Sequence, residues 1–129
     1  MAERPLSPHI SVYRWAYTMT LSILHRATGI TLSLALIGLV LWLVAIGLGP
    51  ARYASWMPLL DSWPALLLFA VAIVAIIYHF CNGIRHLIWD LGFGYERHEA
   101  RASAWVVIIA TILGSALALY FLLHRGGDS

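Results

Sequence analysis

Side chains that could bind a metal or move a proton gather in one stretch of the chain, YHFCNGIRHLIWD, residues 78–90. This stretch follows a very hydrophobic run, yet it carries two histidines, an arginine and an aspartate. Neutral imidazole is a common protein ligand for metal ions and for haem iron. His79, Gly83, His86 and Asp90 are separated by four, three and four residues, so in a helix they share one face.

A second polar cluster lies in TLSILHRATG, residues 20–29. Ser22 is three residues from His25 and four from Arg26, which places all three side chains on neighbouring positions of one helical face. The polar residues of both stretches therefore form stripes, and each stripe is a candidate site.

The depth of His79 in its segment separates it from the other polar residues. It follows Pro64 by fifteen residues, which places it about 20 Å into a helix at ~1.5 Å per residue. Two interpretations fit such a histidine: a haem ligand, or a side chain hydrogen-bonded to a neighbouring helix. Gly83, one turn after His79, also has two interpretations: it could make room for a porphyrin, or it could allow close helix packing. Arg26, Arg85 and Asp90 could alternatively extend towards lipid headgroups.

The composition predicts the elements that must position these residues. Hydrophobic residues make up 61% of the 129 residues and charged residues 11%, and the mean hydropathy is +0.82, values typical of an integral membrane protein. A bilayer core of about 30 Å requires about 20 apolar helical residues. We therefore expect an all-α fold in one domain, residues 1–129, with three transmembrane helices. The expected helices cover about residues 21–49, 62–91 and 101–124.

The sequence also bears on a nucleic-acid partner, on the role of the cysteine and on a signal peptide. No basic run indicates a nucleic-acid partner, and the single cysteine, Cys81, is expected to be a small packing residue. The N-terminal residues show no apolar segment or cleavage site typical of a signal peptide.

The arginines predict an orientation, because cytoplasmic flanks of transmembrane helices are enriched in positive charge. Six arginines lie before the first helix, near its start or around the second loop: Arg4, Arg14, Arg26, Arg85, Arg97 and Arg101. The opposite side has only Arg52 and Arg125. The sequence therefore predicts a cytoplasmic N-terminus, with both polar clusters in the cytoplasmic leaflet.

Three segments together resemble one family. RPLSPHISVY (4–13), SILHRATG (22–29) and HFCNGIRHLIWDLG (79–92) are similar to the cytochrome b556 subunits of succinate dehydrogenase, and the three-helix pattern extends this resemblance over nearly the whole chain. The family implies that His79 is one axial ligand of a single haem b and that the partner anchor subunit supplies the other. His86 lies seven residues further on, about 10 Å along the helix, so it cannot bind the same iron from the same face.

The resemblance also implies the remaining site roles. Ser22 and Arg26 match the residues of the ubiquinone site, where a hydroxyl and a guanidinium can stabilise negative charge on a quinone oxygen. His25, Arg85 and His86 are expected to pair with haem propionates, and Asp90 to orient its neighbours or relay protons.

The expected function is that of a membrane anchor of succinate dehydrogenase, outside the catalytic core, in the inner membrane of a bacterium. Its expected partners are lipid, a second anchor subunit, a flavoprotein subunit and an iron–sulfur subunit, since one cysteine cannot hold iron–sulfur clusters. Two alternatives stay open: a fumarate reductase anchor that uses menaquinone, and a non-redox membrane scaffold whose polar stripes only join helices.

Overall fold

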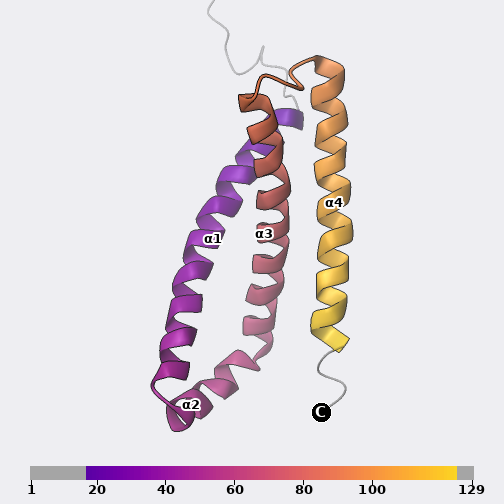
Figure 1. Ribbon diagram of the computed structural model, residues 1–129. Helices are drawn as coiled ribbons and strands as arrows, with labels where there is room; N and C mark the ends of the chain where they lie inside the picture. The colour runs from indigo at the N-terminus through magenta and orange to yellow at the C-terminus, as the bar shows by residue number, and fades with distance from the viewer. Residues whose placement is uncertain (1–16, 125–129) are drawn as a thin grey trace, which may run out of the picture.

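The structure is a computed structural model, and it describes residues 17–124. This part of the chain is mostly helical. The helices follow in the order α1 (Tyr17–Gly47), α2 (Pro50–Leu60), α3 (Trp63–Asp90) and α4 (Arg97–His124). No strand occurs between residues 17 and 124. Figure 1 shows α1, α3 and α4 as three long helices side by side, with the short α2 at the far end of α1.

Three of these helices are long and apolar enough to cross a membrane: Thr18–Gly47, Trp63–Asp90 and Arg97–His124. This confirms the predicted all-α fold with three transmembrane helices, and the chain is a multi-pass membrane protein. The cytoplasmic N-terminus stays a prediction, and three of the arginines on which it depends, Arg4, Arg14 and Arg125, lie outside the described residues.

Helix α2 was not expected from the sequence, which predicts a first helix that continues to residue 49. Instead α1 ends at Gly47, and Gly49 has a φ of 100°, a left-handed conformation that glycine adopts without steric cost. Pro50 then begins α2, as proline often does at a first helical position. Pro58 lies inside α2, where a proline usually signals a break, and this explains why sequence reasoning missed the helix.

Local signals set the ends of α3. The Ser62 hydroxyl caps its start by accepting a hydrogen bond from the backbone N–H of Ala65 at 3.4 Å. At its other end Gly92 has a φ of 89° and turns the chain towards α4. The result is a helix of 28 residues that carries His79 in its interior.

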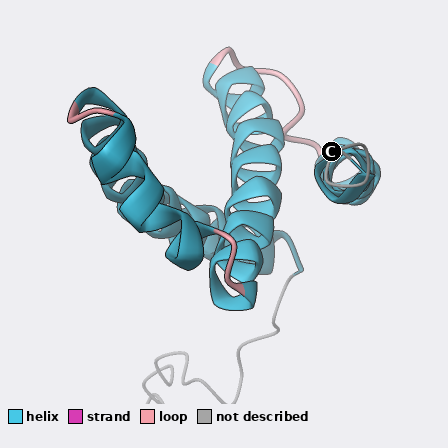
Figure 2. Ribbon diagram, turned by 90° about the horizontal axis from the view of Figure 1, so that it is seen from below, coloured by secondary structure: helices cyan, strands magenta, loops and turns pink. Residues whose placement is uncertain are grey.

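Helix α3 lies between α1 and α4 and contacts both (Figures 1 and 2). A small buried cluster joins the three helices and consists of Leu21, Tyr78, Ala104 and Val107. Gly114 of α4 lies against Ile77 of α3, since a Cβ atom at Gly114 would be 3.2 Å from Ile77 Cγ2. Most other large apolar side chains are exposed and therefore available to lipid or to other membrane helices.

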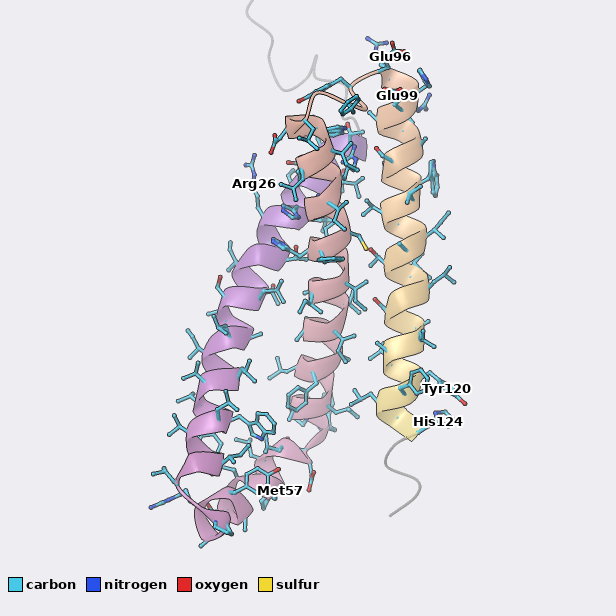
Figure 3. All side chains as sticks on the ribbon, in the orientation of Figure 1. Arg26, Met57, Glu96, Glu99, Tyr120 and His124 are labelled. Atoms are coloured by element: carbon cyan, nitrogen blue, oxygen red, sulfur yellow. The ribbon has the colours of Figure 1, made fainter. Side chains whose placement is uncertain are left out.

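The two ends of the bundle differ in the residues that they carry. Figure 3 shows Arg26, Glu96 and Glu99 at one end, and Met57, Tyr120 and His124 at the other. The histidines of α1 and α3 lie towards the Arg26 end, so the two polar clusters of the sequence meet there.

Candidate functional site

The centre of the candidate site is a pair of stacked histidines. His25 of α1 and His79 of α3 have ring centroids 4.0 Å apart and ring planes 10° from parallel. His86, about two turns after His79, tilts against His25 with a centroid distance of 5.1 Å. The structure thus brings His25 of α1 into contact with two predicted site residues of α3, His79 and His86.

Two glycines allow this close approach. A Cβ atom at Gly29 would lie 3.2 Å from His79 Cε1, and one at Gly83 would lie 3.7 Å from His25 Cε1. Each glycine therefore faces the histidine of the opposite helix. Sequence reasoning selected Gly83 but missed Gly29, whose signal is its position four residues after His25 in the same motif.

Hydrogen bonds fix the orientation of the His79 ring. Its Nδ1 lies 3.2 Å from the backbone oxygen of His25 and 3.2 Å from the Thr28 hydroxyl oxygen. A carbonyl oxygen can only accept, so Nδ1 carries the proton and donates. The Thr28 hydroxyl in turn donates to the backbone oxygens of Leu24 and His25, each at 2.9 Å. The other ring nitrogen, Nε2, therefore holds the lone pair that a metal can bind.

This arrangement fits a haem. Nε2 of His79 can ligate an iron, while Nδ1 of His25 is buried and has no hydrogen-bond partner within residues 17–124. A buried imidazole nitrogen without a partner is costly, and a polar group of a cofactor would satisfy it. The two glycines let the imidazoles of His25 and His79 approach each other between the helices. These residues can hold one side of a haem and supply one iron ligand.

Ser22 and Arg26 lie on α1, one turn apart, at the same end as the histidines. Ser22 is half-buried and Arg26 is exposed, and Figure 3 shows Arg26 pointing away from α3. Neither side chain has a hydrogen-bond or ion-pair partner within residues 17–124. Both are therefore available to donate hydrogen bonds to a bound molecule at the membrane boundary.

Arg85 is directed differently from the other predicted residues. Its side chain is buried, with 3% exposed, and its guanidinium contacts α4: Nε donates to the Ser103 hydroxyl at 3.0 Å, and Nη2 donates to the backbone oxygen of Ala100 at 3.2 Å. It also covers the ring of Trp89 at 4.0 Å. Its pairing with a haem propionate stays a prediction.

Asp90 is exposed at the last residue of α3. It has no partner within residues 17–124. The structure therefore adds nothing to the role that the sequence predicts for it.

Two buried polar residues were missed by sequence reasoning. The Tyr78 hydroxyl donates to the backbone oxygen of Leu21 at 2.6 Å and so joins α3 to α1. Asn82 is fully buried, and its Oδ1 accepts from Nη1 of Arg85 at 3.4 Å. The available signal was their spacing, because residues 78, 82 and 85 recur at helical intervals on a face next to the histidines.

An apolar groove lies on that neighbouring face. It has a volume of about 450 Å³ and runs along α1 and α3 as far as Thr111 of α4. The hydroxyls of Thr31 and Thr111 donate to backbone oxygens of their own helices, so the groove presents mainly hydrocarbon. It offers no second chemical site.

Comparisons with known proteins show which family the chain is similar to. Residues 1–118 match a family model described as the succinate dehydrogenase/fumarate reductase transmembrane subunit. The chain is 38% identical over 112 residues to a succinate dehydrogenase cytochrome b556 subunit of Rickettsia felis, covering 86% of each chain. It is 43% identical over 119 residues to the mitochondrial succinate dehydrogenase cytochrome b560 subunit of Sus scrofa, covering 88% of this chain and 69% of the relative.

Proposed function

Because the chain belongs to the family of succinate dehydrogenase/fumarate reductase transmembrane subunits, we propose that it holds haem b with a second membrane subunit and forms part of a ubiquinone-reduction site. The observation that carries the proposal is the orientation of His79. Its Nδ1 is engaged by the His25 backbone oxygen and by Thr28, which leaves Nε2 for the iron. The names of the relatives, cytochromes b556 and b560, imply haem b.

The residues around His79 give the haem side of the site its chemistry. A bound haem b supplies one-electron transfer. Thr28 and the His25 backbone hold the imidazole in one tautomer, and such outer hydrogen bonds tune a metal ligand. The unpartnered Nδ1 of His25 and the nearby His86 are suited to hydrogen-bond propionates. The second iron ligand comes from the partner anchor subunit in this proposal.

Ser22 and Arg26 give the quinone side its chemistry. Reduction of a quinone places negative charge on a carbonyl oxygen, which a hydroxyl donor and a guanidinium stabilise. Both side chains lie at the end of α1 where the predicted cytoplasmic boundary supplies protons. Asp90, exposed at the same end, is suited to deliver them.

The remaining electron path requires partners. The chain contains one cysteine and cannot hold an iron–sulfur cluster by itself. We assign the oxidation of succinate and the transfer of electrons towards the membrane to a flavoprotein and an iron–sulfur subunit. The relatives from Rickettsia favour a bacterial inner membrane as the location.

The alternatives differ in how well they fit. A non-redox scaffold accounts for the hydrogen bonds that join His79 to α1. It does not account for the buried Nδ1 of His25 that has no partner within residues 17–124, or for the cytochrome names of the relatives. A fumarate reductase anchor that uses menaquinone keeps the same fold, and the family description includes it. The curated relatives named above are subunits of succinate dehydrogenase, which favours succinate oxidation and ubiquinone.

A reduced-minus-oxidised absorption spectrum tests the haem proposal. The complex would be purified with its partners from wild type, from His79→Ala and from a control, His98→Ala. His98 is exposed at the start of α4. We expect a low-spin b-type spectrum in wild type and control, and its loss or shift in His79→Ala. An unchanged spectrum and midpoint potential in His79→Ala would refute the assignment.

A further inference from the structure

All three guanidinium nitrogens of Arg85 donate hydrogen bonds, and two of them connect α3 to α4. Nε and Nη2 reach Ser103 and the backbone oxygen of Ala100 on α4, while Nη1 reaches Asn82 on α3. The Ser103 hydroxyl also donates to the Ala100 backbone oxygen at 3.2 Å, so these three residues close a small hydrogen-bonded ring. A buried charge in this setting is held in one geometry.

The same guanidinium lies over the indole of Trp89, with Cζ 4.0 Å from the ring centroid. Nε1 of Trp89 donates to the backbone oxygen of Gly94 at 3.0 Å, and its ring stacks with Tyr95 at a centroid distance of 6.1 Å. Trp89 is thus fixed from one side by Arg85 and from the other by the α3–α4 turn.

Trp89 in turn meets the histidines. Its ring stands edge-on to His86 at 5.4 Å and 83°. His86 contacts His25 at 5.1 Å, and His25 stacks on His79 at 4.0 Å. An unbroken series of ring contacts therefore leads from α4 through Arg85 to the proposed haem ligand.

Because of its position on α3, Arg85 can act on His79 only through the ring contacts of Trp89, His86 and His25. Residues 79 and 85 are six positions apart, so their side chains leave the helix about 120° apart at 100° per residue. His79 faces α1, whereas Arg85 faces α4. The guanidinium and the haem ligand thus lie on different faces of one helix.

We propose that Arg85 is a positioning residue: by fixing α3 to α4 and holding Trp89, it sets the orientation of the His86 and His25 rings, and His25 stacks on the proposed iron ligand, His79. The inference rests on the proposed haem-binding function. Lysine would keep the charge but would lose the planar group that both donates in three directions and stacks on an indole. The role therefore requires the planar guanidinium group, and the positive charge alone does not suffice.

The test uses Arg85→Lys in the complex purified with its partners, compared with wild type and Arg97→Lys. Arg97 is an exposed arginine at the start of α4. In Arg85→Lys we expect a shifted and broadened low-spin haem signal in electron paramagnetic resonance and a changed midpoint potential. We also expect faster amide hydrogen exchange in the turn of residues 91–96. Arg97→Lys should match wild type in all three measurements.

An assembled Arg85→Lys complex with wild-type haem signals would overturn the inference. If that variant fails to assemble, Ser103→Ala decides instead, because it removes the acceptor of Nε and the hydroxyl donor to Ala100 but keeps the guanidinium. Shifted haem signals support the role and unchanged signals overturn it. Failure of the proposed function is distinguishable, since it would appear as an unchanged haem spectrum in His79→Ala.

Discussion

Gly29 on α1 faces the edge of the His79 imidazole on α3, and a Cβ atom there would lie 3.2 Å from His79 Cε1. The ring cannot retreat freely, because its Nδ1 is bonded to Thr28 and to the backbone of His25. The packing of two helices and the orientation of the proposed iron ligand therefore depend on one missing methyl group.

Gly29→Ala should perturb the haem. Alanine favours helix over glycine by ~1 kcal/mol, but here its methyl group would push against His79. We expect a shifted haem absorption spectrum and midpoint potential in the purified complex, measured by redox titration.

Gly38→Ala is the matched control, since nothing lies within 4 Å of a Cβ atom at Gly38 on the same helix. Gly83→Ala should behave like this control, because the nearest atom to a Cβ there, His25 Cε1, is at 3.7 Å, an ordinary van der Waals contact. Equal behaviour of the Gly29 and Gly38 variants would show that the α1–α3 contact tolerates a methyl group.

Ser22→Ala should slow quinone reduction without affecting succinate oxidation by an artificial acceptor that takes electrons before the membrane. Loss of one hydrogen bond to a developing oxyanion costs roughly 3 kcal/mol, or about a hundredfold in rate. Arg26→Leu should act in the same direction and could also disturb a haem propionate. Steady-state assays with both acceptors measure the difference. Full quinone reductase activity and unchanged sensitivity to quinone-site inhibitors in Ser22→Ala would assign the hydroxyl to helix packing.

The predicted orientation can be read from thiol accessibility. In a Cys81→Ala background, which leaves no native cysteine, Glu99→Cys should react with a membrane-impermeant reagent only from the cytoplasmic side. Ser55→Cys in α2, at the opposite end of the bundle, should react only from the other side. Labelling of Glu99→Cys in intact cells from outside would reverse the topology.

The three long helices follow directly from the sequence, because the length and apolar character of a membrane span leave few alternatives. Helix α2 does not, since Pro50 and Pro58 are typical of a break and the segment is too short to cross.

The candidate site was also predicted only in part from the sequence. The spacing of His79, Gly83 and His86 predicts a shared face, and the structure places that face against His25. The rotation of α3 between its two neighbours does not follow from one sequence, so the direction of Arg85 towards α4 could not be predicted. Tyr78 and Asn82 were missed because their roles depend on atoms of other helices or on a buried partner.

Tyr78→Phe should weaken the contact between α1 and α3. The Tyr78 hydroxyl is buried and donates to the Leu21 backbone oxygen at 2.6 Å, and a hydrogen bond between membrane helices contributes about 0.6 kcal/mol on average. We expect a lower midpoint temperature for loss of haem or subunits from the purified complex, with the spectrum unchanged at low temperature. Tyr120→Phe is the control, because Tyr120 is 54% exposed near the end of α4. Equal midpoints for the two variants would mean that the apolar contacts of the Tyr78 ring, and not its hydroxyl, hold α1 against α3.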